Sequence, residues 1–308
     1  MKILNAALYG LLILLCLFPI ISAPLALLLG LIFALIFKSP FPAFNKKASK
    51  YLLQVAVVGL GFGMNVQEAL KAGSDGIVFT IFSVVSVLAL GIWFGKLLKV
   101  SPIQAYLISS GTAICGGSAI AAVGPVAKAS DAEMSVSLAT IFVLNAIALF
   151  IFPVLGHLSN LSQHQFGMWA AIAIHDTSSV VGAAASYGEE ALKVATTVKL
   201  ARALWIIPLS IFSVFYFKSD KRKISVPWFI LFFVLAMTLN SLINIPDYIT
   251  HGIVSGSKQA LTLTLFLIGA GLSKDTIKTV GFKPLILGLL LWFFIAIISF
   301  IFIIIFYQ

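Results

Sequence analysis

The chain has 308 residues, of which 61% are hydrophobic and only 10% are charged, and its mean hydropathy is +1.12. Soluble domains carry about 25% charged residues, so this composition excludes a soluble protein with a single anchor and predicts an integral membrane protein. The net charge is +10, but the basic residues lie mostly in short loops, which indicates membrane topology rather than nucleic-acid binding.

Long apolar segments recur from one end of the chain to the other, and most reach the roughly 17–25 residues that cross a bilayer as a helix. Residues 1–23 resemble a signal peptide, but its cleavage site would precede Pro24, where a proline is unfavourable. We therefore assign this segment to the first of about eleven transmembrane helices. The predicted helices cover residues 3–21, 24–37, 51–66, 77–98, 103–127, 133–155, 165–187, 191–217, 226–243, 254–272 and 281–307.

The loop charges predict which way the chain is oriented. When the loops are assigned alternately to two sides, most lysine and arginine residues gather on the side of the N-terminus. The other side holds only Lys71, Lys128, Lys193 and Lys258. Cytoplasmic loops carry the excess of lysine and arginine, so the N-terminus is predicted to be cytoplasmic and the C-terminus outside.

Two basic residues lie inside the helix predicted for residues 191–217. At 1.5 Å rise per residue, Lys199 and Arg202 fall near the middle of the bilayer. Cations at that depth are costly and usually mark a site, and a spacing of three places both on one helix face. We expect both to bind an anionic substrate. The alternatives are snorkelling to the interface and a structural pairing with Asp176.

The helix predicted for residues 165–187 contains the polar pair His175 and Asp176. Asp176 is the only acidic residue that we place deep inside a predicted helix, and histidine titrates near physiological pH. Two buried cations against one acid leave a positive charge that a bound anion would balance. The pair is therefore predicted to couple or gate transport, and Asn145 is a weaker candidate for the same role.

Two predicted helices contain residues that weaken a helix. Residues 109–125 read SSGTAICGGSAIAAVGP, and residues 175–188 read HDTSSVVGAAASYG. We predict that both helices are broken at the midplane, as in transporters, where half-helix N-termini face anionic groups. Helix packing through small residues would explain the glycines but not the His–Asp pair. The predicted substrate-binding residues at these breaks are Cys115, Gly116, Gly117, Ser118, Thr177, Ser178 and Ser179.

Weak internal similarity predicts two inverted repeats, at about residues 24–155 and 165–307. The string AICGGSAIAA aligns with AIHDTSSVVG, but the charge map predicts that these two segments run in the same direction. The string GLGFGMNVQEALKAG aligns with LIGAGLSKDTIKTVG, in helices of opposite direction. The repeat register makes the helix at residues 254–272 the partner of the helix at 103–127, and glycines at 255–257 or 269–271 would break it.

The strings GTAICGGSAIAAVGPVAKA and AIHDTSSVVGAA…GEEALKVATTVKLARALWIIPL resemble the YeiH-type family of bacterial inner-membrane proteins, which carries the label sulfate exporter. The resemblance is strongest over residues 59–208. It implies a secondary transporter related to bile-acid/sodium symporter-like folds, with a core of crossing broken helices and a flanking panel domain. The family carries other small or polar residues at Ser178 and Ser179. The matching residues are Cys115, Gly116, Ser118, His175, Asp176, Lys199 and Arg202.

The sequence thus predicts an all-α polytopic membrane protein that forms a single transporter domain over residues 1–308. Its predicted function is proton-coupled secondary active transport of a small anion by alternating access. The anion would be sulfate, sulfite, or an organic sulfonate or carboxylate. The alternatives are a sodium-coupled organic anion symporter, a passive channel, and an intramembrane enzyme with Cys115 or Ser118 as nucleophile and His175 as base.

The predicted partners are the small anion, a coupling H⁺ or Na⁺, the lipid bilayer and, as an open alternative, a second copy of the chain. We predict no metal site, no cofactor and no nucleic-acid partner. The predicted location is the bacterial inner membrane.

Overall fold

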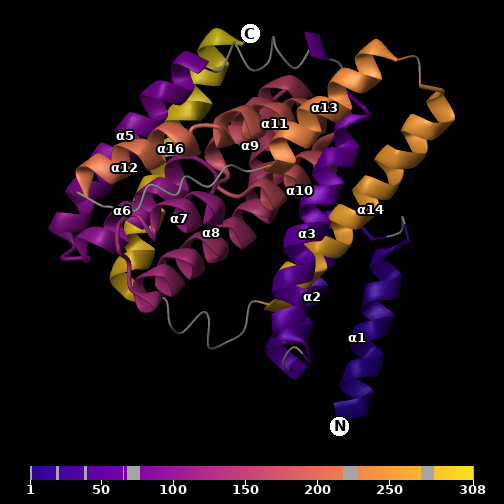
Figure 1. Cartoon of the computed structure of the whole chain (residues 1–308), viewed down its shortest axis with the longest axis horizontal. Coiled ribbons are helices and arrows are strands. Elements are labelled where there is room, and N and C mark those ends of the chain that lie inside the picture. Colours follow the sequence, from indigo (N-terminus) through magenta and orange to yellow (C-terminus); the bar gives the residue numbers. More distant parts are fainter. Residues whose placement is uncertain are drawn as a thin grey trace.

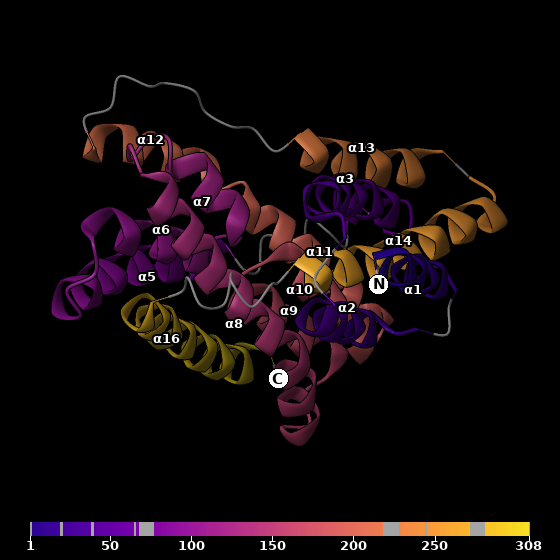
Figure 2. The ribbon, with the colours of Figure 1, turned by 90° about the horizontal axis from the view of Figure 1, so that it is seen from below.

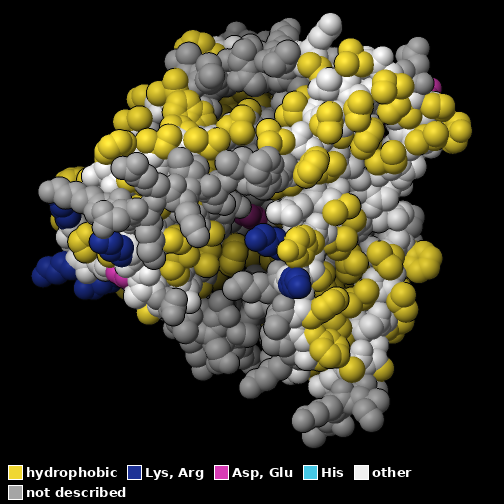
Figure 3. All heavy atoms as spheres, viewed as in Figure 1, with side chains coloured by type: hydrophobic (Ala, Val, Ile, Leu, Met, Phe, Trp, Pro, Cys, Tyr) yellow, Lys and Arg dark blue, Asp and Glu magenta, His cyan; other side chains and the backbone are white. Residues whose placement is uncertain are grey.

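The computed structural model describes residues 2–18, 21–37, 40–64, 66–67, 77–217, 228–243, 245–271 and 281–307. The regular secondary structure in these residues is helical (Figure 1). Five helices are long and apolar enough to cross a membrane by length and composition, and several shorter helices are also apolar. Large hydrophobic side chains such as Phe293 and Ile301 are exposed, and hydrophobic side chains cover much of the surface in Figure 3. The chain is therefore a helical membrane protein.

The helices form two groups, which we call the panel and the core (Figures 1 and 2). In the panel, α14 packs along α2 and α3, and α13 packs on α3. In the core, α16 packs against α5, α6, α8 and α9. The panel consists of α1 (Lys2–Cys16), α2 (Ala23–Phe37), α3 (Pro42–Gly61), α13 (Trp228–Leu242) and α14 (Asp247–Gly271). The core consists of α5 (Ile77–Leu97), α6 (Pro102–Ala113), α7 (Gly117–Val123), α8 (Asp131–Leu158), α9 (Gln163–Ala173), α10 (Thr177–Tyr187), α11 (Glu189–Ala203), α12 (Ile206–Tyr216) and α16 (Phe282–Phe306).

The labelled chain ends lie at opposite ends of the molecule in Figure 1, which defines an N-side and a C-side. Helix α8 has 28 residues, which corresponds to about 42 Å of helix, so it extends from the N-side to the C-side. One helical hairpin precedes α8 on the N-side, and a second hairpin follows it on the C-side.

The segment predicted as one helix over residues 103–127 is a hairpin that enters from the N-side. Helix α6 ends at Ala113, and α7 folds back on it, since a Cβ on Gly111 would lie 3.0 Å from Ile120 Cδ1. Ser101, just before α6, donates a hydrogen bond of 2.6 Å to Glu133 Oε1 at the start of α8. The predicted break is confirmed, but the predicted crossing is wrong, because the segment leaves on the side where it entered.

The segment predicted as one helix over residues 165–187 is a second hairpin. The Tyr187 hydroxyl at the end of α10 donates to Leu161 O at 2.6 Å, and Glu190 N donates to Gln163 Oε1 at 3.0 Å. The end of α10 therefore lies beside the start of α9, and this segment also turns back. Because the two hairpins flank opposite ends of α8, they run in opposite directions, and the prediction of a common direction is wrong.

Local capping signals set the starts of the helices next to the hairpins. Ser130 and Glu133 form a capping box at the start of α8, and Ser162 and Gln165 form one at the start of α9. In such a box the serine side chain accepts from the third residue of the helix, and that residue's side chain accepts from the serine N–H. Lys128 precedes α8 and therefore moves to the N-side, with most of the other described basic residues.

Other helix bounds differ from the predicted ones. Helix α3 begins at Pro42 rather than at residue 51. Its first turns carry lysines, so a search for apolar residues places the start of the helix too late. Helix α14 runs unbroken from Asp247 to Gly271, so the predicted break at 255–257 is wrong. The Ser257 hydroxyl donates to Ile253 O at 2.7 Å, within the helix itself. Residues 19–20, 65, 226–227 and 272 of the predicted helices lie outside the described residues.

Candidate functional site

The tips of the two hairpins meet beside the middle of α8. Gly116 has φ of +62°, and a Cβ there would lie 3.3 Å from both Cα and Cβ of Asp176. Glycine adopts this left-handed conformation without strain and leaves room for the other tip. Asn145 Oδ1 on α8 accepts hydrogen bonds from His175 N at 3.0 Å and Asp176 N at 3.3 Å. One side chain of α8 therefore fixes the second tip against the first.

Lys199 holds the carbonyl oxygens at the second tip. Its Nζ donates to Ala171 O at 3.2 Å and to Ile174 O at 2.8 Å. In an unbroken helix Ala171 O would accept from His175 N, which instead bonds to Asn145. The C-terminal end of a helix carries a partial negative charge. The end of α9 therefore supplies a counter-charge for this buried cation.

Arg202 makes the same kind of contact at the first tip. Its Nη2 donates to Ala113 O at 2.6 Å, at the C-terminal end of α6, and its Nη1 donates to Ser83 Oγ at 3.0 Å. The side chains of Lys199 and Arg202 are both at most 1% exposed. In the described part of the chain neither cation forms an ion pair with Asp176. The alternative of a structural ion pair with Asp176 is therefore not present, and backbone carbonyls accept from both side chains instead.

Asp176 caps the N-terminus of α10 instead. Its Oδ2 accepts from Ser178 N at 3.1 Å and also from the Ser178 hydroxyl. An aspartate at this position satisfies a free N–H of the first turn and interacts favourably with the helix dipole. Asp176 is only partly buried and lines the large cavity between the tips and the panel.

Several buried polar atoms around the tips lack hydrogen-bond partners within the described residues. They include both ring nitrogens of His175, Nδ2 of Asn145, Nε of Arg202 and Oγ1 of Thr112. Buried polar groups in folded proteins are nearly always paired, so these atoms are free to bind a ligand or water at the tips; the Ser137 and Ser210 hydroxyls, elsewhere in the core, also lack partners among the described residues. Among the described residues neither ring nitrogen of His175 has a hydrogen-bond partner, so the ring accepts from neither Cys115 nor Ser118 in this conformation.

A cavity of about 1570 Å³ separates the hairpin tips from the panel. On the core it is lined by α7, the first half of α8 and the start of α10, and on the panel by α2, α3, α13 and α14. Lys50, Ser135 and Phe229, near the N-side starts of their helices, also line it. The cavity therefore extends from the tips to the N-side. Figure 3 shows a hollow between the two groups, with basic side chains beside it.

The cavity divides the predicted site residues into two sets. The residues that line it are Gly117, Ser118, Asn145, Asp176, Ser178 and Ser179. The other predicted site residues are buried and do not line the cavity. They are Cys115, Gly116, His175, Thr177, Lys199 and Arg202.

The prediction missed Lys50 and Gln54, which line the cavity one helical turn apart on α3. Among the described lining residues, Lys50 is the only cation and Asp176 the only acid. The lysines of this region were counted as loop charges. The spacing of Lys50 and Gln54 on one face of a helix that begins at Pro42 was the signal that could have found them.

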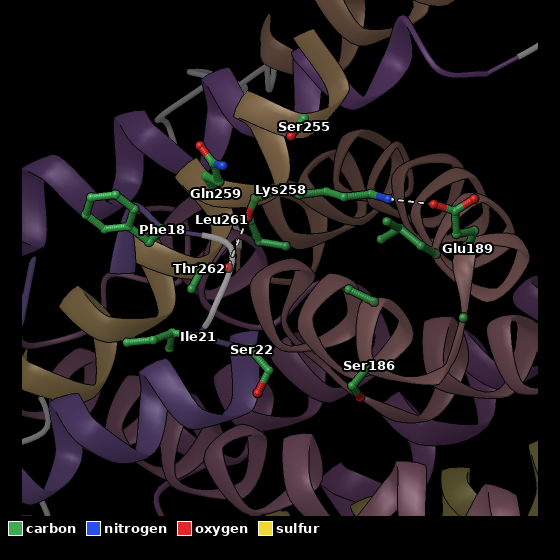
Figure 4. Close-up of a pocket in the computed structure, with 13 residues that line it drawn as sticks. Phe18, Ile21, Ser22, Ser186, Glu189, Ser255, Lys258, Gln259, Leu261 and Thr262 are labelled. Atoms are coloured by element: carbon green, nitrogen blue, oxygen red, sulfur yellow. Dashed lines mark hydrogen bonds and ion pairs between the residues drawn. The ribbon is translucent and has the colours of Figure 1, made fainter. Parts of the chain in front are cut away.

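A smaller pocket of about 310 Å³ lies between the core and the panel on the C-side. Figure 4 shows Lys258 of α14 reaching across it to Glu189 at the start of α11. Their ion pair has an Nζ–Oε1 distance of 3.0 Å. Met64 Sδ, just after α3, accepts a hydrogen bond from Thr197 Oγ1 of α11 at 3.9 Å. Core and panel are thus in direct contact on the C-side, whereas a large cavity separates them towards the N-side.

Comparison with known proteins gives a family. Residues 3–288 match the family described as "Conserved hypothetical protein 698". A UPF0324 membrane protein of Bacteroides thetaiotaomicron is 60% identical over 278 residues, which cover 90% of this chain and 84% of that protein. One of Porphyromonas gingivalis is 55% identical over 287 residues (92% and 87%), and one of Vibrio parahaemolyticus is 49% identical over 297 residues (94% of each). No solved structure matches the chain.

Proposed function

The chain belongs to the family described as Conserved hypothetical protein 698, whose relatives named above are bacterial membrane proteins, and we propose that it is a secondary active transporter of a small anion. The observation that carries this proposal is the contact between Gly116 and Asp176 at the inner end of a cavity that reaches the N-side. Broken helices that meet at the midplane are typical of secondary transporters. Irregular backbone is tolerated at that depth only inside protein or along a cavity.

The hairpin arrangement supports the proposed inverted repeats. Residues 24–155 would contain the N-side hairpin, and residues 165–307 would contain the C-side hairpin. The two hairpins lie on opposite sides, as inverted repeats require, and pairing them would replace the register that matched the helix at 254–272 with the helix at 103–127. Repeats of this kind permit alternating access. Each repeat can adopt the conformation of the other, which opens the same site to the opposite side of the membrane.

We assign the anion to the space lined by Ser118, Asn145 and Ser179, next to the N-terminus of α10. Lys199 and Arg202 lie directly behind this space with their donors on backbone carbonyls. In this proposal they fix the tips and add positive potential, rather than touching the anion. Lys50 adds a cation at the N-side end of the cavity and would attract anions towards it.

Asp176 is the proposed site of the coupling proton, because it is the only acid among the described lining residues. An ionised carboxylate repels an anion bound beside it, and a proton removes that repulsion. Anion and proton would therefore bind together. His175 is fully buried behind the tip, so in this proposal it orients the tip. A sodium ion on Asp176 is the alternative coupling cation.

The sulfate-exporter label of the YeiH-type family agrees with an anionic substrate. For orientation, we propose that the N-side is cytoplasmic, since most of the described lysine and arginine residues lie there, Lys128 included. This places the N-terminus inside and the C-terminus outside in the bacterial inner membrane. The structure would then be open to the cytoplasm, with Glu189 and Lys258 at the closed outer side.

Transport in proteoliposomes tests the proposed function. We expect saturable uptake of labelled anions when the lumen is more alkaline than the medium, with sulfate, sulfite and benzenesulfonate compared at equal concentration. Uptake driven by a sodium gradient alone would identify the sodium-coupled alternative. Flux that neither saturates nor responds to a gradient would indicate a passive channel, and the absence of flux for all anions would contradict the proposal.

The Glu189–Lys258 ion pair is expected to hold the C-side closed. Exposed ion pairs contribute about 0.2–1 kcal/mol, so Lys258→Glu should raise the open population of the C-side by up to about fivefold. The readout is the rate at which a membrane-impermeant thiol reagent labels Thr262→Cys, because Thr262 lines the C-side pocket and is buried. Both native cysteines are buried, so the background labelling is low.

Exchange of the two charges provides the control for this prediction. The double variant Lys258→Glu/Glu189→Lys restores an ion pair and should return labelling to the original rate. Lys47→Glu makes the same change of charge on an exposed residue of the panel away from this pocket, and should leave the rate unchanged. Equal labelling in all four proteins would contradict a closing role for the pair.

A further inference from the structure

The cavity is far larger than an inorganic anion requires. Its volume is about 1570 Å³, whereas an inorganic oxyanion of four oxygens occupies roughly 60 Å³, about twice the 30 Å³ share of one water molecule. Pockets that bind organic ligands commonly measure about 300–1,000 Å³. The space in front of the hairpin tips therefore fits a ligand with a substantial body.

The cavity walls are mainly apolar between the tips and the N-side. Leu138 and Phe142 line it from α8, and Val58, Phe62 and Leu239 face it from the panel. Such side chains form no hydrogen bonds with the water shell of a hydrated ion. Their contact with an apolar group removes apolar surface from water, which stabilises the complex. The wall chemistry therefore favours a ligand that carries apolar surface.

The tip end of the cavity offers a donor for the charged end of such a ligand. Asn145 lines the cavity and is 3% exposed, and its Oδ1 is turned to the backbone N–H groups of His175 and Asp176. These bonds fix which side of the amide is oxygen, so Nδ2 is the donor that lacks a partner among the described residues. A buried donor without an acceptor is unfavourable, and a ligand oxygen would satisfy it.

We propose that the cavity binds an organic anion with an apolar body, a sulfonate or a carboxylate, rather than inorganic sulfate. Its oxygens accept from Asn145 Nδ2 and the Ser179 hydroxyl at the tips. Its body lies against Phe142 and the wall formed by α3 and α13. This inference rests on the proposed transport function, because it names the class of substrate for the same site.

This inference is tested by measuring how tightly the protein binds a series of anions that share a sulfur oxyanion head and differ in the size of the apolar body. The probes are inorganic sulfate, methanesulfonate, benzenesulfonate and naphthalene-2-sulfonate, measured by calorimetry on the purified full-length protein in lipid nanodiscs. Burial of a phenyl-sized group is worth about 1.5–3 kcal/mol, so benzenesulfonate should bind at least tenfold more tightly than methanesulfonate. Equal affinity across the series, or tightest binding of sulfate, would overturn the inference.

Variants separate the contribution of the head from that of the body. Phe142→Ser should weaken the two aromatic sulfonates at least fivefold and leave methanesulfonate unchanged, while Phe142→Leu should retain most of the affinity. Phe293→Ser changes an exposed aromatic residue of α16 away from the cavity, and corrects for partition into lipid. Asn145→Asp keeps the acceptor for the tip but removes the donor, so it should weaken all sulfonates alike. A Phe142→Ser protein that binds the aromatic probes normally would refute the assigned wall.

Binding and transport give separable results. If naphthalene-2-sulfonate binds with the expected dependence on Phe142 but no anion is transported, the transport function fails and the substrate-class inference stands. If proteoliposomes accumulate sulfate and the protein shows no preference for an apolar body, the transport function stands and the inference fails.

Discussion

Replacing Lys199 with methionine is expected to lower the free energy of unfolding by about 3 kcal/mol and to abolish transport. Methionine keeps an unbranched apolar stem but removes Nζ, which donates to Ala171 O and Ile174 O. A hydrogen bond to a charged group contributes about 1.5–3 kcal/mol, and a buried acceptor without a donor costs about 1–3 kcal/mol. Because Ile174 lies two residues before Asp176, the tip would lose the contacts that hold its backbone just before this carboxylate.

Lys193 provides the matched control on the same helix. It is exposed, so Lys193→Met should change the free energy of unfolding by no more than about 0.5 kcal/mol. Both variants are compared by thermal denaturation in detergent and by amide hydrogen exchange at residues 174–178. Exchange should rise there in Lys199→Met and remain unchanged in α16. Equal stability of the two variants would show that the carbonyl contacts do not hold the tip.

Replacing Asp176 with asparagine is expected to uncouple the anion from the proton gradient. With one proton per anion, the unaltered protein should accumulate its substrate about tenfold per unit of pH difference, since one unit corresponds to 1.36 kcal/mol. The variant should show no accumulation, because its amide takes no proton. Exchange of labelled for unlabelled anion should persist, because the neutral side chain does not repel the anion.

The fold of this variant should be preserved, because asparagine is as good an N-cap as aspartate and can accept from Ser178 N. Asp247→Asn alters an exposed acid at the start of α14, and should accumulate substrate like the unaltered protein. Accumulation by Asp176→Asn equal to that of the control would show that the coupling proton binds elsewhere. If Asp176→Asn loses both exchange and accumulation, Asp176 would instead be assigned to anion binding.

Prediction from the sequence was most successful where a property depends on consecutive residues. The low charge and long apolar segments gave the class of helical membrane protein. The breaks were predicted in the correct segments because glycine and short polar side chains disfavour a helix locally, whatever surrounds them. Cys115–Ser118 and His175–Ser179 therefore lie at or beside the observed breaks.

Prediction failed where the direction of the chain depends on distant partners. An apolar segment of suitable length reads the same whether it continues across the membrane or turns back after a break. The bonds from Ser101 to Glu133 and from Tyr187 to Leu161 decide that both segments turn back. The partners are 32 and 26 residues apart, beyond the reach of any local pattern.

By itself, the sequence determined that this chain is a membrane protein, that two of its apolar segments are broken, and that Lys199 and Arg202 lie inside an apolar helical segment. Each of these follows from the residue types in one short window. Only the tertiary structure decided that the breaks meet, that the two cations bind carbonyls at the breaks, and that Lys50 shares a cavity with Asp176. These arrangements arise from packing between helices distant in sequence, where a freed carbonyl takes the nearest buried donor because an unpaired polar group is costly in an apolar interior.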